Sequence, residues 1–237
     1  MKHYDFSLLY QPEDRSKGLS EDSEDWLVAR LGRVTASKRA HTIITGRDKT
    51  IALMMDEMAN ELGTEPEGFS NKYTEHGHAF EDQAIGEYDM MRLGLGGIVR
   101  KPGLFVHKDI DIASATPDFF EGDDITGQVK CPYYEKNHLA LLHFGVQPKP
   151  GVQGHPQYYT QVQFESFVTG RPRIVFVSYH PDVPVKNQLY VETMEADQDL
   201  HDKFRSKLEW IHHMLVNDER PHEAGDPLGA AGIPDLF

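Results

Sequence analysis

The chain has 237 residues, of which 39% are hydrophobic and 26% charged, as expected for a globular protein with one substantial core. A formal net charge of −14 excludes a protein that coats nucleic acid with its whole surface, but not a DNA enzyme whose basic residues line one cleft. No apolar run reaches the roughly 20 residues that span a membrane. The only cysteine, Cys131, has no partner for an internal disulfide. We therefore expect no membrane contact and a cytoplasmic setting, in a bacterial host cell.

Helices are predicted in the first part of the chain. Acidic residues lead into a short helix at residues 26–31, and residues 35–37 open a second one with Thr35 or a neighbour as its N-cap. Residues 50–62 and 75–93 carry apolar side chains at helical spacing, which predicts two longer helices.

Strands and helices alternate in the rest of the chain. The predicted strands are residues 96–106, 110–115, 125–131, 173–179 and 188–193. The predicted helices are residues 134–144, 157–168 and 197–216. This order predicts an α/β (α+β) fold with a mixed central sheet flanked by helices. We expect a single domain at residues 1–217 and a flexible C-terminal tail at residues 218–237.

The residues that suggest chemistry lie near the middle of the chain. Asp118 is predicted to end one strand, and Gln128 and Lys130 share one face of the next, because alternate residues of a strand point the same way. A hairpin would bring the three side chains together. Oxygen ligands suit Mg²⁺, which polarises a phosphate, and an ammonium group stabilises charge developing there. The carbonyl of Val129 is a further possible ligand. The spacing alone fits an ordinary turn and an exposed lysine equally well.

Four blocks of sequence add to this pattern. They are WLVARLGRVTAS at residues 26–37, HGHAFEDQA at residues 76–84, TPD and VKCP within residues 116–132, and QVQ at residues 161–163. In this order the blocks resemble those of the lambda-type phage exonucleases, viral recombinase nucleases of the PD-(D/E)xK superfamily.

The resemblance implies a PD-(D/E)xK, restriction-endonuclease-like core and a set of site residues. Asp118, Gln128, Glu81 and the carbonyl of Val129 would hold Mg²⁺, with Mn²⁺ as a substitute and two ions per site. Lys130 would be the catalytic lysine.

The resemblance also implies contacts with DNA. Arg30 and Ser37 would bind a 5′-phosphate, and Thr35 is counted among the DNA-binding residues. Tyr73 would lie at a wedge that splits the terminal base pair, and Gln161 or Gln163 would support the site. Asp109 matches a further aspartate of the family, with its spacing to Asp118 off by one residue.

The activity that the resemblance implies is a magnesium-dependent 5′-to-3′ exonuclease. It would degrade one strand of linear double-stranded DNA with a 5′-phosphate and leave 3′ overhangs for a single-strand annealing protein. A homotrimer around the duplex is implied as well. Two alternatives stay open: a site-specific PD-(D/E)xK endonuclease, and a non-catalytic protein that binds DNA ends.

Position 128 departs from the family pattern, which has glutamate there. The amide of Gln128 lacks the negative charge, and its NH₂ group cannot ligate a metal. We therefore predict a catalytically impaired nuclease, and the near-isosteric change favours a deliberate Glu-to-Gln substitution. The alternative is a natural variant in which Asp118, Glu81 and the Val129 carbonyl suffice for the metal.

Overall fold

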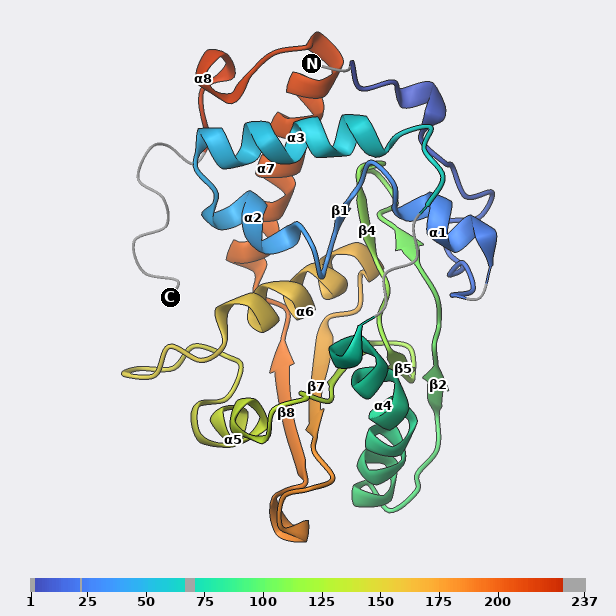
Figure 1. Cartoon of the computed structure of the whole chain (residues 1–237), viewed down its shortest axis with the longest axis vertical. Coiled ribbons are helices and arrows are strands. Elements are labelled where there is room, and N and C mark those ends of the chain that lie inside the picture. The colour runs from blue at the N-terminus through green and yellow to red at the C-terminus, as the bar shows by residue number, and fades with distance from the viewer. Residues whose placement is uncertain (1–2, 22, 67–70, 228–237) are drawn as a thin grey trace.

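A computed structural model describes residues 3–21, 23–66 and 71–227 of the chain. Within these ranges a five-stranded sheet and a three-stranded sheet lie among helices (Figure 1). The helices are α1 (Glu24–Arg30), α2 (Ala40–Thr45), α3 (Asp48–Glu61), α4 (Lys72–Met91), α5 (Glu135–Phe144), α6 (Pro156–Thr169), α7 (Gln198–Asn217) and α8 (Pro221–Ala224), with 3-10 turns η1 (Phe6–Leu8) and η2 (Val185–Asn187). The strands are β1 (Val34–Thr35), β2 (Ile98–Arg100), β3 (Phe105–Val106), β4 (Ala113–Ala115), β5 (Phe119–Glu121), β6 (Ile125–Lys130), β7 (Arg173–Tyr179) and β8 (Leu189–Glu195).

The larger sheet has the order β2-β5-β6-β7-β8 and is mixed. β5 and β6 form an antiparallel hairpin, whereas β6 and β7 run parallel, with Gln128 opposite Phe176. Parallel neighbours need a long crossover, and α5 and α6 provide it between these two strands. The smaller sheet, in the order β1-β4-β3, is also mixed. The predicted mixed sheet flanked by helices is therefore confirmed.

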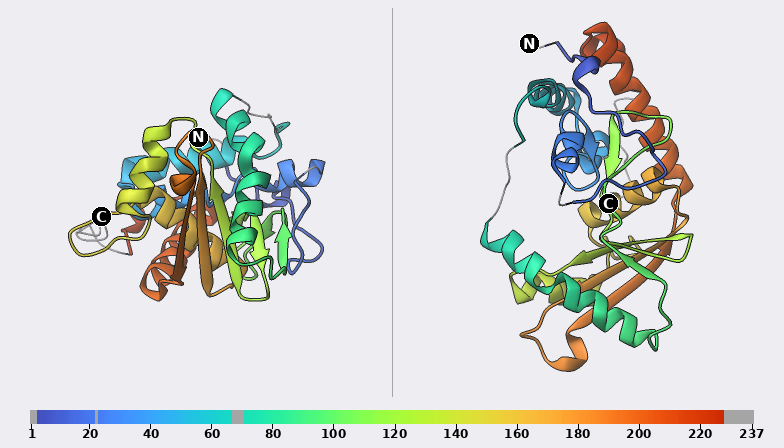
Figure 2. Two further views of the ribbon diagram at one scale, coloured as in Figure 1. Left: turned by 90° about the horizontal axis from the view of Figure 1, so that it is seen from below. Right: turned by 90° about the vertical axis from the view of Figure 1, so that its right-hand side faces the viewer.

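Alternate residues of β6 and β7 face different helices. Val129 and Val177 belong to one apolar cluster with Ile85 of α4, and α4 lies along this face of the sheet (Figure 2). Phe176 belongs to a second, larger cluster with residues of α6 and α7 such as Phe204. Because side chains alternate along a strand, the even-numbered residues of β6 face α6.

Helix α6 is enclosed on nearly every side. It starts with Pro156 at its first turn and is capped after Thr169 by Gly170, whose φ of 71° is the left-handed conformation that glycine adopts readily. All ten residues from 159 to 168 are buried. Apolar side chains of this stretch pack in the larger cluster, so the polar side chains among them must find partners inside the protein.

Three local expectations are corrected by the structure. Thr35 does not cap a helix: it pairs with Ser114 in the smaller sheet, and α2 begins at Ala40 instead. The expected strand at residues 96–106 is divided between the two sheets, with Pro102 and Gly103 between β2 and β3. Asp118 directly precedes a strand rather than ending one, because β5 follows it.

The segment expected to be a flexible tail is partly structured. Residues 221–224 form α8, and ion pairs join Arg220 to Asp56 and Lys207 to Asp226. Residues 228–237 lie outside the described part of the chain. Throughout that part, every helix is too short or too polar to cross a membrane.

Candidate active site

A cavity of about 540 Å³ opens where the carboxyl end of β6 meets the first half of α4 and the start of α6. Its lining is formed by Tyr73, Thr74, Gly77, His78, Glu81, Asp118, Gln128, Val129, Lys130, Cys131, Pro132, Tyr133, Tyr134, Asn137 and Tyr158. The structure thus brings together Asp118, Gln128, Val129, Lys130, Glu81 and Tyr73, the first five of which the sequence assigns to catalysis or metal binding.

Backbone hydrogen bonds fix Asp118 against β6. Its N–H donates to the Gly127 carbonyl at 3.0 Å, and its Oδ2 accepts from the Val129 N–H at 2.6 Å. Its own carbonyl accepts from the N–H of Lys101 at 2.8 Å. The aspartate is therefore held in register with Val129 without relying on its neighbours' side chains.

The carboxyl groups of the site lie in surroundings that disfavour charge. Burial raises the pKa of Asp118 to about 7, while Lys130 acts in the opposite direction and Glu81 adds to the rise. Burial likewise raises the pKa of Glu81, against the nearby ammonium group of Lys101. A cation bound between these groups would remove the penalty, so both carboxyl groups are suited to hold a metal.

The amide of Gln128 has a definite orientation. Its Nε2 donates to Asp118 Oδ2 and, at 3.2 Å, to the Val129 carbonyl. Its Oε1 accepts from Gln161 Nε2 at 2.7 Å. The NH₂ group of Gln128 therefore contacts the Asp118 carboxylate and the Val129 carbonyl, the two oxygens that are expected to bind a metal.

The donor set fits a hard divalent cation. Asp118, Glu81 and the Val129 carbonyl are oxygen donors on one cavity, and Mg²⁺ needs only one or two protein carboxylates when phosphate and water complete its shell. In the described ranges, no three acidic, histidine or cysteine side chains gather as a closed metal site. Any cation here would depend on carbonyl and substrate oxygens for its remaining ligands.

Aromatic side chains stand at the rim of the cavity. Tyr73, Tyr133 and Tyr134 contact one another, with the Tyr73 and Tyr133 ring centroids 5.3 Å apart, and each is more than 40% exposed. Lys72 Nζ lies 5.0 Å from the Tyr73 ring. Lys130 Nζ lies 5.6 Å from the ring of Tyr158 on α6. Exposed rings beside ammonium groups are suited to stack on bases and attract phosphates.

Several predicted DNA-binding residues lie outside this cavity. Arg30 sits on α1 with its guanidinium 4.4 Å from the Trp26 ring centroid. Burial lowers the pKa of Arg30, against the nearby carboxylate of Glu21. Ser37 is exposed, and Thr35 is buried.

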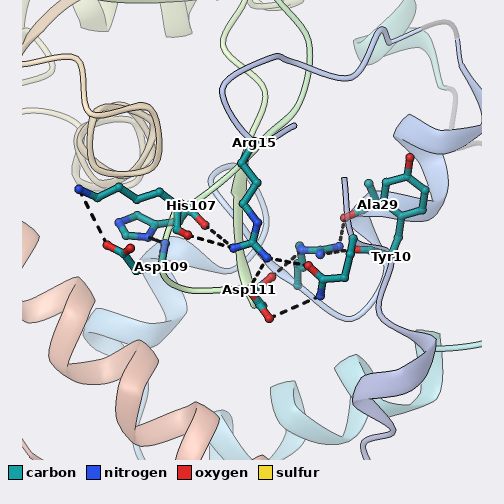
Figure 3. A network of polar contacts seen from close by, with 9 residues as sticks. Tyr10, Arg15, Ala29, His107, Asp109 and Asp111 are labelled. Atoms are coloured by element: carbon teal, nitrogen blue, oxygen red, sulfur yellow. Dashed lines mark hydrogen bonds and ion pairs between the residues drawn. The ribbon is translucent and has the colours of Figure 1, made fainter. Parts of the chain in front are cut away.

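Gln163 and Asp109 have other surroundings. Gln163 donates to the Glu195 carbonyl and accepts from the Asp197 N–H, so it ties α6 to the start of α7. Asp109 is well exposed beside Lys108 and His107, in a polar network centred on Arg15 (Figure 3). Neither side chain lines the cavity.

Two residues close to the site carry no signal in the sequence. Lys101 has a φ of 48°, unusual for a non-glycine residue, and lies near Glu81. Glu165 is 1% exposed and accepts from Gln161 Nε2 at 2.9 Å. From sequence alone, a glutamate within a helix is expected to be exposed to solvent. Glu165 is buried only because α6 is enclosed by the rest of the protein.

A mixed sheet whose β5–β6 hairpin carries Asp118 and Lys130, with Gln128 between them in the chain and Glu81 on the neighbouring helix, defines the class of PD-(D/E)xK nuclease folds, with glutamine at the position of the second hairpin acid. Within that class, residues 25–172 match the YqaJ-like viral recombinase domain, and the chain belongs to this family. The match covers more than half of the 237 residues.

Solved structures agree with this assignment. The alkaline exonuclease LHK-Exo from Laribacter hongkongensis is 26% identical with a TM-score of 0.69, over 83% of this chain and 94% of that one. Its complex with dAMP is 27% identical, with the same TM-score and coverage. A phage-related exonuclease from Haemophilus somnus 129PT shares the fold, at 15% identity and a TM-score of 0.60 over 78% of this chain and 96% of that one. A search of curated proteins gave no match.

Proposed function

We propose that the chain is a divalent-metal-dependent DNA exonuclease that degrades the 5′-ended strand of a linear duplex. The observation that carries the proposal is the gathering of Asp118, Glu81, the Val129 carbonyl and Lys130 on one cavity. Family membership and the likeness to alkaline exonucleases indicate a nuclease. The likeness to a structure in complex with dAMP, a deoxynucleoside monophosphate, fits the release of such products from DNA.

Different groups of the site would have different roles in phosphodiester hydrolysis. Asp118, Glu81 and the Val129 carbonyl would hold Mg²⁺ or Mn²⁺, as two ions by the resemblance drawn from the sequence. When bound, the metal polarises the phosphate and lowers the pKa of water. The ammonium group of Lys130 stabilises negative charge that develops on the phosphate. The tyrosines at the rim stack on bases near the strand end.

The finer features of the proposal concern the DNA end and the assembly. Arg30 would anchor a 5′-phosphate, and the product would be a 3′ overhang for a single-strand annealing protein. A homotrimer around the duplex is part of the proposal. Exposed apolar side chains near the carboxyl end of α4, including Met90 and Leu93, support self-association, since such groups commonly mark protein contacts. Light scattering of the purified chain tests the trimer.

A second candidate is favoured by the orientation of Gln128. Because its NH₂ group lies on Asp118 and Val129, the chain could bind DNA ends and metal weakly without cutting. Metal-dependent retention of linear DNA without cleavage would support this candidate. Cutting of closed circular plasmid would instead indicate an endonuclease.

The experiment uses a linear duplex labelled on each strand in turn, with and without a 5′-phosphate, in Mg²⁺ or Mn²⁺. We expect slow loss of the 5′-ended strand only. Asp118→Ala should abolish that activity while the circular dichroism spectrum is kept, because the principal metal ligand is removed. Full activity in Asp118→Ala would overturn the site, and degradation from the 3′ end would overturn the polarity.

A further inference from the structure

The polar side chains of α6 find partners in two different directions. Gln163 and Ser166 bond to backbone groups away from the cavity. Gln161 and Glu165, one helical turn apart, face β6 instead and bond to each other. Glu165 Oε2 is buried and has no hydrogen-bond partner in the described ranges. A buried acid with this placement calls for a reason beyond packing.

The hydrogen bonds from Glu165 to the cavity all have one polarity. Gln161 Nε2 donates to Glu165 Oε1 at 2.9 Å and to Gln128 Oε1 at 2.7 Å. Gln128 Nε2 then donates to Asp118 Oδ2 and to the Val129 carbonyl. Along the series from Glu165 to Gln161 to Gln128, the orientation of each amide is therefore set by its hydrogen-bond partner on the Glu165 side.

A carboxylate at position 165 fixes this polarity, because it can only accept hydrogen bonds. Turning the Gln161 amide around would set its oxygen against the carboxylate of Glu165. With Gln161 held as a donor, Gln128 must present its oxygen to α6 and its NH₂ group to the cavity. A cation binding at Asp118 and Val129 then has to displace that NH₂ group.

The same polarity would favour a carboxylate at position 128. Such a group can accept from Gln161 with one oxygen and offer the other to a cation, whereas an amide has one acceptor only. The effect of Glu165 on metal binding therefore depends on the residue at position 128.

We propose that Glu165 is a positioning residue that acts through Gln161 to set which end of the side chain at position 128 faces the metal. The inference rests on the proposed function and assigns to this buried acid a role in metal affinity. With Gln128 the role is inhibitory; with glutamate at that position it is supportive.

The test is Mn²⁺ binding by calorimetry, without DNA, in four proteins: the unchanged chain, E165Q, Q128E and Q128E/E165Q. The measurements are made at alkaline pH, because burial raises the pKa of Glu165 well above its usual range and a neutral carboxyl group can donate as well as accept.

We expect E165Q to raise the Mn²⁺ affinity of the unchanged chain about tenfold, roughly the net worth of one hydrogen bond, because a second amide lets the whole series turn around. In the Q128E background the same change should lower the affinity, because glutamate at position 128 is supported by the present polarity. An unchanged or lowered affinity in E165Q, or an equal gain in both backgrounds, would overturn the proposal.

A charge-conserving pair provides a second measurement should E165Q fold poorly. Gln161→Glu/Glu165→Gln exchanges the two side chains along α6 and reverses the polarity, so it should also raise Mn²⁺ affinity. An unchanged affinity in this variant would contradict the proposed polarity.

The matched control is Glu192→Gln. Glu192 is another buried glutamate that accepts hydrogen bonds, from the Val146 N–H and the Tyr190 hydroxyl, and it lies outside the cavity. Its replacement should lower the melting temperature without changing Mn²⁺ affinity. If none of the proteins bound Mn²⁺, Q128E included, the proposed function itself would fail. Binding that is indifferent to position 165 would overturn the role of Glu165 alone.

Discussion

The side chain at position 128 meets a donor on one side and two acceptors on the other. Gln161 donates to it, while Asp118 and the Val129 carbonyl accept from it. An amide satisfies this arrangement in the absence of metal. A carboxylate would satisfy it only with a cation present, which is the difference between a metal-free resting site and a metal-dependent one.

Replacing Gln128 by glutamate should therefore restore a stronger metal site. We expect Q128E to digest linear duplex at least about tenfold faster at limiting Mg²⁺, because a charged oxygen replaces an NH₂ group that cannot ligate. Gln157→Glu is the control: it makes the same chemical change at an exposed position at the start of α6. Equal rates for Q128E and the unchanged chain would mean that glutamine is competent at this position.

Arg30 is expected to discriminate between DNA ends. Its contact with Trp26 holds the guanidinium in place, and a fixed fork of donors recognises phosphate well. Arg30→Ala should weaken binding of 5′-phosphorylated ends by about 1–3 kcal/mol and leave hydroxyl ends nearly unaffected. Anisotropy titrations with the two kinds of end measure this. Arg173→Ala, at the opposite end of the sheet from the cavity, should behave like the unchanged chain.

The sequence predicts individual site residues unevenly, for physical reasons. Asp118, Gln128 and Lys130 could be predicted because strand alternation and a hairpin bring them together. Glu165 could not, because nothing in its helical sequence reveals that α6 is enclosed on nearly every side. Lys101 approaches Glu81 only because of an unusual backbone conformation, which its residue type does not suggest.

At the scale of the elements, the long helices and buried strands follow from periodicity, whereas short pieces do not. Residues 50–62 and 173–179 were predictable because their apolar spacing extends over many residues. β1 has only two residues, and its pairing with β4 is decided by contacts distant in sequence. Because β1 begins at Val34, Thr35 lies inside the strand, and this tertiary pairing overrides the preference of threonine for a helix N-cap.

The β5–β6 hairpin that carries the site depends on a glycine. A Cβ at Gly127 would lie 2.1 Å from Cζ of Phe119, a ring that is wholly buried and pairs with it across the hairpin. Gly127→Ala should cost on the order of 1–3 kcal/mol of unfolding free energy in chemical denaturation, because the ring has no room to move. It should also reduce Mg²⁺ affinity, since Asp118 bonds to the same residue's carbonyl.

Gly86→Ala is the comparison for that variant. Gly86 lies inside α4, and a Cβ there would meet only Arg100 Nη2, at 3.9 Å. Alanine in a helix interior is favoured over glycine by about 0.5–1 kcal/mol, so this change should stabilise the protein. A loss of stability in Gly86→Ala, or none in Gly127→Ala, would contradict the packing described here.

At the scale of the whole molecule, a chain with a net charge of −14 repels DNA over most of its surface, so the basic groups that attract DNA have to be gathered at one place. Lys130 lines the cavity beside the partly buried ring of Tyr158, and the ammonium group of Lys72 lies beside the exposed ring of Tyr73. A bound divalent cation would add positive charge at the same point. Metal loading and DNA binding should therefore be closely coupled in this protein.

The buried acids link the stability of the folded chain to pH and metal. The pKa of Asp118 is raised from near 4 to about 7, and burial also raises the pKa values of Glu81 and Glu165. Between about pH 4 and pH 7, the metal-free folded state therefore binds more protons than the unfolded state. The stability contributed by Asp118 is fully present below about pH 4 and is lost as the pH rises through about 7.

Magnesium should compensate for that loss, because it binds the deprotonated carboxylate of the folded state only. We expect Mg²⁺ to raise the melting temperature clearly one to two units above the pKa of about 7, and hardly at all the same distance below it. Differential scanning calorimetry at the two pH values measures the shift. Asp118→Asn should show a smaller fall of the metal-free melting temperature across this range and no shift with Mg²⁺. A Mg²⁺ shift of equal size at both pH values would mean that Asp118 is not the group through which metal and protons compete.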